Sequence, residues 1–129
     1  MKYKIFVDGQ EGTTGLKIHD YLSKIPNIEV IKIDSEKRKD YEARRALINE
    51  ADVVFLCLPD SASRDSVSMI SNNKTKIIDA STVFRTNQEW TYGLPELHKN
   101  QRNKIQNSSR VSVQGCHATG FIFWLYTLW

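Results

Sequence analysis

The chain has 129 residues, of which 40% are hydrophobic and 26% are charged, and its formal net charge is +3. This length fits one small domain that buries roughly two thirds of its unfolded surface. Because basic and acidic residues are interleaved, the composition predicts no nucleic-acid interface, whereas a small anionic ligand is compatible with it.

The cysteines and the N-terminus bear on the compartment. Cys57 lies inside an apolar run and Cys116 follows a glycine, so their contexts suggest no disulfide framework. No basic and apolar leader precedes the first strand pattern. We therefore expect a protein of the reducing cytoplasm.

The first feature along the chain is a strand pattern that meets a glycine-rich turn. Residues 5–7 are apolar and too few for a helix, and three glycines spaced three apart follow them: Gly9, Gly12 and Gly15. Gly9 suits a sharp turn, Gly12 lets backbone approach a diphosphate, and Gly15 lets the next helix pack close to the strand. The spacing is a variant of the G-x-G-x-x-G motif of dinucleotide-binding proteins.

Two threonines stand where this turn becomes a helix. Thr13 and Thr14 can cap the helix or donate hydroxyls to phosphate oxygens, and the N–H groups of the first turn add positive potential. We therefore favour a dinucleotide pyrophosphate site here. The alternative is a glycine-rich strand–helix turn that binds nothing.

The second strand pattern ends beside a group of cations. Helical spacing predicts a helix over 16–25 that Pro26 stops, and residues 28–33 then alternate like a strand. After this strand of a nucleotide-binding unit, an acid favours NAD, whereas cations or hydroxyls favour NADP. Asp34 gives the first signal, and the residues after it give the second: Ser35, Lys37, Arg38 and Lys39. We favour NADP, held by Ser35 and Arg38, over a loop that is merely solvated.

A helix and a third strand come next. Asp40 is a suitable N-cap for a helix that runs to Glu50, with Ala43, Ala46, Leu47 and Ile48 as its inner face. The continuous apolar centre of residues 51–58 predicts a strand covered on both faces, in which Cys57 packs rather than reacts. Pro59 and Asp60 follow at the sheet edge where open α/β sheets bind ligands, and a helix opens at Ser61. We expect Pro59 to line the cofactor.

The remaining strand patterns complete the predicted fold. Residues 76–82 form a fourth strand pattern that closes in small polar residues, with Ser81 a candidate cofactor contact. An irregular segment, 83–97, and a short polar stretch, 98–102, precede a possible fifth strand at 110–113. Because strand and helix alternate with short connections, we predict a doubly wound parallel sheet, Rossmann-like, in the α/β class.

Cys116 is the candidate nucleophile. It follows a strand pattern and a glycine and precedes a possible helix from Ala118, so helix N–H groups can stabilise its thiolate. Arg85 or Arg110 are cations that could lower its pKa further. The alternative is a small residue that fills a tight turn.

The histidines are weaker candidates. Adjacent side chains at a helix start generally diverge, so we do not expect His117 to serve as the catalytic base. His19 and His98 are most simply surface residues. No His, Cys, Asp and Glu set has the spacing of metal ligands, so no metal is implied.

Five stretches in a fixed order carry a family resemblance: VDGQEGTTG (7–15), CLPD (57–60), DASTVFR (79–85), YGLPEL (92–97) and GCHATG (115–120). Together they resemble the short-form N-acetyl-gamma-glutamyl-phosphate reductases of arginine biosynthesis over nearly the whole chain. Aspartate-semialdehyde dehydrogenases share the plan but match these stretches less well.

The resemblance implies NADPH-dependent reduction of N-acetyl-gamma-glutamyl phosphate to N-acetylglutamate semialdehyde. On this reading Cys116 attacks the acyl carbon, phosphate departs, and the thioester accepts hydride. Backbone N–H groups around Cys116 would stabilise the oxyanion. Arg85 is the candidate for the substrate phosphate, with a structural salt bridge as the alternative. Full-length family members imply a homo-oligomer.

The chain departs from the family in two respects. Val113-Gln114 stands where many members have Asn-Pro, and the chain ends where members continue into a second domain that carries the catalytic histidine. We therefore divide it into a dinucleotide-binding domain, 1–112, and the start of a catalytic domain, 113–129, as in a fragment or truncated gene. A partner domain or another subunit would cover the apolar residues 121–129.

Two other readings of the chain compete with a reductase. A non-catalytic dinucleotide-binding module that senses or regulates is the principal alternative. A tail that docks to membrane is disfavoured, because residues 121–129 have no polar face and are too few to span a bilayer.

Overall fold

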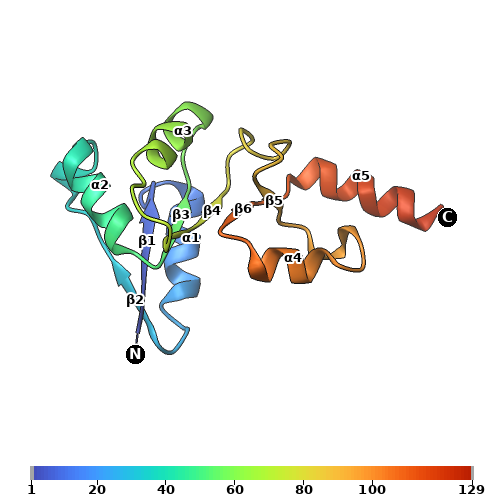
Figure 1. Ribbon diagram of the computed structural model, residues 1–129, viewed down its shortest axis with the longest axis horizontal. Helices are drawn as coiled ribbons and strands as arrows, with labels where there is room; N and C mark the ends of the chain where they lie inside the picture. The colour runs from blue at the N-terminus through green and yellow to red at the C-terminus, as the bar shows by residue number, and fades with distance from the viewer. Residues whose placement is uncertain (1, 129) are drawn as a thin grey trace.

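The short apolar runs of the sequence form one sheet in the computed structural model, which describes residues 2–128. All pairings are parallel and the strand order is β2-β1-β3-β4-β6-β5 (Figure 1). The six strands are β1 (Tyr3–Asp8), β2 (Ile28–Ile31), β3 (Val53–Leu56), β4 (Lys76–Asp79), β5 (Thr91–Tyr92) and β6 (Arg110–Ser112). The predicted doubly wound parallel sheet is confirmed.

Helices connect the strands and cover both faces of the sheet. They are α1 (Thr13–Leu22), α2 (Tyr41–Glu50), α3 (Asp60–Ser68), α4 (Gln101–Asn107) and α5 (Cys116–Thr127), with short 3₁₀ turns η1 (Ser35–Lys37) and η2 (Pro95–Leu97). In Figure 1, α1, α2 and α3 surround the strands on the left, whereas α4 and α5 lie on the right and α5 extends away from the sheet.

The alternation of side chains along the strands divides the core in two. Phe6, Val54 and Leu56 face α2 and α3, where they pack with buried Ile48 and Met69. On the other face, the smaller cluster of Ile5, Val7 and Leu22 packs beneath α1. The sheet therefore carries most of its buried apolar surface on the side of α2 and α3.

The expectation that β3 is covered on both faces is confirmed only in part, because its second face packs against the smaller cluster without being fully buried. Val54 and Leu56 are buried, but Val53 and Phe55 are only half-buried. The cause lies in the placement of α1, which packs against β1 and β2. A continuous apolar run predicts two covered faces only if a helix lies over each of them.

The bounds of α1 and one residue of the inner face of α2 differ from the predicted ones. The first helix spans Thr13–Leu22 instead of 16–25, because it starts directly after Gly12 and because Asn27, with φ 65°, reverses the chain before β2. Ala46, assigned to the inner face of α2, is exposed. The predicted N-cap of α2 is confirmed: the Asp40 carboxylate accepts a hydrogen bond of 2.7 Å from Ala43 N.

Two elements were not predicted: β5 and α4. β5 has two residues, and α4 is polar with a single half-buried apolar side chain, Ile105, so neither leaves a periodic signal. Buried Gln101 joins them, because its Nε2 donates to Tyr92 O at 2.5 Å. The irregular segment before β5 is anchored by the stacked rings of Phe84 and Trp90, 4.1 Å apart.

Candidate functional site

The glycine turn after β1 is built from close backbone contacts. Gly9 has φ +90°, and a Cβ there would overlap the carbonyl oxygen of Cys57 at the end of β3. Gly15 is buried, and a Cβ there would overlap the carbonyl oxygen of Gly9. The predicted tight turn is thus confirmed at Gly9, and Gly15 brings α1 against the turn itself.

Gly12 differs from the other two glycines, because its surroundings are open. It is the N-cap of α1, its φ of −74° suits any residue, and a Cβ would meet nothing closer than Gly9 O at 3.5 Å. No side chain caps the helix. Capping by Thr13 or Thr14 is therefore a wrong expectation: both are exposed residues inside the first turn, one step too late to cap it.

A cavity of about 400 Å³ lies beside this turn. It is lined by residues at the ends of β1 and β3, by residues that flank η1, and by residues of α2 and α3: Asp8, Gly9, Gln10, Glu11, Gly12, Ile33, Arg38, Lys39, Arg44, Cys57, Leu58 and Ala62. The strand order places it where the sheet reverses direction, because β2 and β3 lie on opposite sides of β1. Ligands of doubly wound sheets bind at this switch point, outside the carboxyl ends of the strands.

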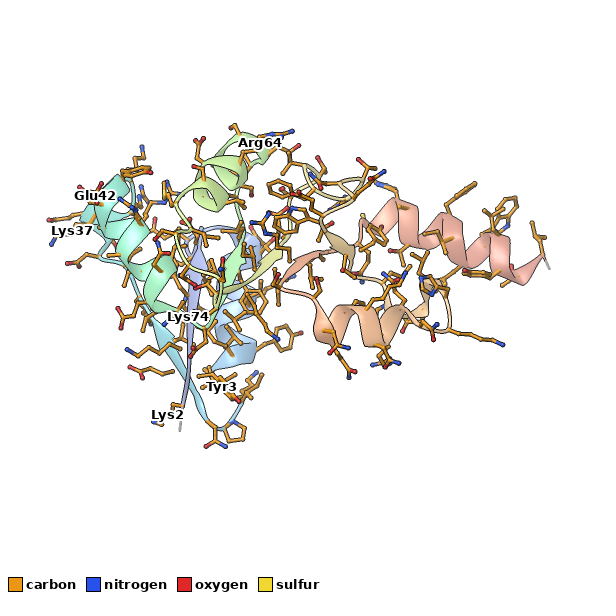
Figure 2. The ribbon with its side chains drawn as sticks, viewed as in Figure 1. Lys2, Tyr3, Lys37, Glu42, Arg64 and Lys74 are labelled. Carbon is orange, nitrogen blue, oxygen red and sulfur yellow. The ribbon has the colours of Figure 1, made fainter. Side chains whose placement is uncertain are left out.

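The cations after β2 are placed unequally. Arg38 and Lys39 line the cavity, and Arg38 forms an ion pair with Glu11 of the glycine turn. Lys37 lies at the outer edge of the molecule, near Glu42 of α2 (Figure 2). Ser35 is exposed on η1 and does not line the cavity. The charge that faces the cavity therefore comes from two cations of the three.

Other predicted cofactor contacts lie beside the cavity without lining it. Pro59 is the exposed N-cap of α3. Ser81 is buried and donates to the Asp79 carboxylate at 2.6 Å, so its hydroxyl is engaged within the protein. Both residues follow strands that lie between β1 and β6 in the sheet order, on the side of Cys116.

Arg44 and Asp8 line the cavity and were not predicted. Arg44 Nη2 is 2.9 Å from the buried carboxylate of Asp8 at the end of β1. The available signal was an arginine beside the inner-face residues Ala43, Leu47 and Ile48 of an otherwise amphipathic helix.

Cys116 is the first residue of α5 and is exposed. Gly115 is the N-cap, its N–H donates to the Tyr92 hydroxyl at 3.3 Å, and no side chain caps the helix. The Cys116 sulfur lies 3.8 Å from His117 Nδ1, so the expectation that these side chains diverge is wrong. Both are exposed at the open end of the helix, where the rotamers are free to converge.

Arg85 holds the turn that carries Cys116. Its Nε donates to Val113 O at 3.0 Å and its Nη2 to Ala80 O at 3.4 Å, joining the ends of β4 and β6. A Cβ at Gly115 would come within 2.6 Å of Nη1, so the guanidinium lies against the backbone before the thiol. The alternative of a structural salt bridge is not realised among residues 2–128, because the partners of Arg85 are carbonyl groups.

Arg110 and Cys57 are the two remaining residues for which the sequence makes a prediction about thiol chemistry. Arg110 begins β6, whereas Cys116 follows its other end, and Arg110 Nη1 lies 3.7 Å from Glu89. Its expected proximity to the thiol is therefore wrong, because the strand separates them. Cys57 is half-buried, and burial, followed by the charges of Asp79 and Asp8, raises its pKa to about 11. This state agrees with the prediction that Cys57 packs.

Comparison with known proteins assigns the chain to a family. Residues 4–107 match the model of the semialdehyde dehydrogenase, NAD binding domain, family. The chain belongs to this family. It is 50% identical over 121 residues to N-acetyl-gamma-glutamyl-phosphate reductase 2 of Nostoc sp., covering 94% of this chain and 38% of that protein. It is 48% identical over 120 residues to N-acetyl-gamma-glutamyl-phosphate reductase of Chelativorans sp., covering 93% of this chain and 39% of that protein. The predicted resemblance is confirmed, and the chain spans about two fifths of the length of these relatives.

Solved structures of this fold agree. Aspartate semialdehyde dehydrogenase from Francisella tularensis superposes with a TM-score of 0.66 at 15% identity, over 88% of this chain and 36% of that one. Aspartate semialdehyde dehydrogenase from Candida albicans, solved with NADP, superposes with a TM-score of 0.57 at 14% identity, over 88% of this chain and 42% of that one. At these identities the match establishes the shared fold.

A semialdehyde dehydrogenase NAD-binding domain takes a nicotinamide dinucleotide, and the residues present suit one. Gly12 leaves open the space that a Cβ would occupy, the first turn of α1 lacks a capping side chain, and three cations, Arg38, Lys39 and Arg44, line the cavity. Within residues 2–128, the helices are too short or too polar to cross a membrane.

Proposed function

We propose that this chain is the NADP-binding portion of an N-acetyl-gamma-glutamyl-phosphate reductase. The observation that carries the proposal is the cavity at the switch point, bounded by the glycine turn of β1 and the end of β3. The identity of 43–50% to reductases of this name supports the substrate assignment. The substrate is then a small acyl phosphate.

The cofactor site follows from the geometry of the turn. Gly12 and the first-turn N–H groups of α1 receive the pyrophosphate, with the hydroxyls of Thr13 and Thr14 as further donors. Arg38 and Lys39 line the cavity and favour the 2′-phosphate of NADP over NAD, with the Ser35 hydroxyl, three residues before Arg38, as a further candidate donor. Pro59 and Ser81, which follow β3 and β4 between the glycine turn and Cys116 in the sheet order, are the residues that would hold the nicotinamide half.

The second half of the site supplies the nucleophile. Bound NADPH supplies hydride chemistry. Cys116 attacks the acyl carbon and displaces phosphate, so the protein holds the acyl group as a thioester and divides one difficult substitution into two easier steps. The N–H groups at the start of α5 stabilise the oxyanion, a contribution of about 3 kcal/mol per donor. Arg85 Nη1 beside Gly115 is the candidate contact for the substrate phosphate.

We assign residues 1–112 to the cofactor domain and 113–129 to the start of a catalytic domain. The isolated chain then binds NADP weakly and turns over little or nothing. His117 lies beside Cys116, but the family resemblance implies a catalytic histidine in the second domain. In the full-length reductase a homo-oligomer is expected.

Substitution of Gly12 tests the cofactor site. Gly12→Ala has room for its Cβ in the free protein but places a methyl group where the pyrophosphate would lie, so we expect NADP to bind at least about tenfold more weakly. Calorimetric titration of the wild type and the variant measures this, with Gly120→Ala as the matched control because its Cβ meets nothing within 4 Å. Equal affinities, or a wild type that binds neither NADP nor NAD, would contradict the assignment.

A non-catalytic dinucleotide-binding module is the second candidate, because Cys116 does not line the cavity beside the glycine turn. Acetyl phosphate and mass spectrometry separate the two. A reductase portion becomes acylated at Cys116, and this blocks alkylation there, whereas a module without chemistry gains no acyl mass. Cys57 is the internal control, since with a pKa of about 11 roughly one thiol in a thousand is thiolate at pH 8.

A further inference from the structure

Asp8, Arg44 and Ser66 form a buried cluster in the wall of the cavity. Arg44 Nη2 donates to Asp8 Oδ2 at 2.9 Å and to Ser66 Oγ at 2.7 Å, and Ser66 Oγ donates to the same Asp8 oxygen at 2.8 Å. The three residues come from β1, α2 and α3, and all are buried or nearly so: the exposed fractions of the Arg44 and Asp8 side chains are 14% and 7%. The cluster therefore fixes both helices to the end of the strand that leads into the glycine turn.

The charge of Asp8 is unfavourable for the ligand proposed for this cavity. Its carboxylate lies one residue before Gly9 and lines the same space as Gly12. A buried carboxylate with no cation beside it would repel a pyrophosphate strongly, since charges interact over longer distances where water is excluded. Arg44 is the cation that balances it.

Stability alone does not account for Arg44. A buried ion pair is often no more stabilising than well-packed apolar residues of similar volume. Here the buried Arg44 Nε has no hydrogen-bond partner among the described residues, which adds a desolvation cost. Because this ion pair carries a desolvation cost and lies in the wall of a cavity, it points to a role in the electrostatic potential of that cavity.

We infer that Arg44 is a positioning residue of the dinucleotide site, which neutralises Asp8 so that the turn after β1 accepts phosphate. The inference rests on the proposed NADP site. It assigns to Arg44 an effect through Asp8 rather than a contact with the ligand, and it separates Arg44 from Arg38 and Lys39, which line the cavity without contacting Asp8.

A double-mutant cycle on the full chain tests this. We expect Arg44→Met to bind NADP at least about tenfold more weakly than the wild type, because Asp8 is then unbalanced. Asp8→Asn/Arg44→Met should restore affinity to within about threefold, since neither charge remains. If the cluster acted only by holding α2 and α3 against β1, removing Asp8 as well as Arg44 would not restore the affinity for NADP. Recovery therefore distinguishes an electrostatic role from a structural one.

Asp8→Asn alone gives a second arm if Arg44→Met fails to fold. It retains Arg44 with no acid beside it, so NADP should bind more tightly than to the wild type, and the gain should shrink as salt is raised. Ser66→Ala is the matched control, because it removes the two hydrogen bonds that Ser66 makes to Arg44 and Asp8 and no charge. Weaker binding by Asp8→Asn, or a double variant as weak as Arg44→Met, overturns the inference while wild-type binding upholds the site. A wild type that binds no dinucleotide overturns the proposed function instead.

Discussion

The two junctions where a parallel strand leads through glycine into a helix are alike in sequence and unlike in structure. Gly12 caps α1 and Gly115 caps α5, and neither helix has a capping side chain. Yet α1 buries Gly15 and Leu22 against the turn and the sheet, whereas α5 has no buried residue. The same local pattern thus precedes one helix that packs on the sheet and one that buries none of its residues.

The difference lies in what holds each junction. At the first, Gly9 and Gly15 are in backbone contact with Cys57 and with each other, so the turn has almost no freedom to change. At the second, the turn depends on side chains: the Tyr92 hydroxyl, the Arg85 guanidinium, and a hydrogen bond from Tyr126 to Leu97 O near the far end of α5. Trp124 and its large apolar neighbours on α5 are exposed, Trp124 by 59%. The first junction is therefore held by backbone contacts, and the second by a few side chains.

The largest effect is expected at the first junction. Gly9→Ala combines a Cβ overlapping the Cys57 carbonyl oxygen with a φ of +90°, so it should lower the free energy of unfolding by about 2–5 kcal/mol. Urea denaturation measures the change. Gly12→Ala is the matched control three residues away and should cost at most about 1 kcal/mol, as an N-cap substitution in open space. Similar losses in both variants would mean that the turn is not locked by backbone contact.

A smaller effect of opposite signs is expected at the second junction. Gly115→Ala forces the Arg85 guanidinium away from its carbonyl partners and should destabilise α5 by about 1 kcal/mol, since the group that yields is the end of a flexible side chain. Gly120→Ala, inside the same helix with no atom near its Cβ, should stabilise α5 by up to about 1 kcal/mol. Hydrogen exchange of the α5 amides measures both, and equal exchange in the two variants would refute the role given to Arg85.

The sequence predicted those parts of the fold that leave a local signal. Residue chemistry over a few positions predicted the Gly9 turn and the Asp40 cap. The alternation of strand and helix predicted that the strands are parallel. The two-residue β5 and the polar α4 depend instead on a contact, Gln101 to Tyr92 O, between residues nine apart. The half-exposed face of β3 depends on where α1 lies, which no run of residues in β3 records.

The candidate site shows the same division. Glycine spacing and the run of cations pointed to the cavity, although the spacing did not decide which cation faces it: Lys37 points outward and Arg38 inward. Arg44 was missed because its role depends on Asp8, 36 residues away in sequence and 2.9 Å away in space. Likewise, Arg85 was predicted as a group for substrate, but its carbonyl partners on β4 and β6 appear only once the strands are adjacent. The roles of Cys116 and the cofactor contacts stay predictions.

The smallest effect concerns Asp60, which links the strand ends between the two junctions. Its carboxylate accepts hydrogen bonds from Thr82 Oγ1 at 2.6 Å and Thr82 N at 2.9 Å, and these bonds lower its pKa. Because the folded pKa lies below the unfolded value of about 3.9, the stabilisation is present at neutral pH and is lost as pH falls through the folded pKa. Asp60→Asn should therefore unfold slightly more easily than the wild type at pH 7, and the difference should shrink as the pH of the urea titration is lowered through the folded pKa. Asp65→Asn, exposed on the same helix with no hydrogen bond to its carboxylate in the described part of the chain, should lack this pH-dependent difference. A difference for Asp60→Asn that is constant over the whole pH range would mean that the hydrogen bonds from Thr82 do not depend on the charge of Asp60.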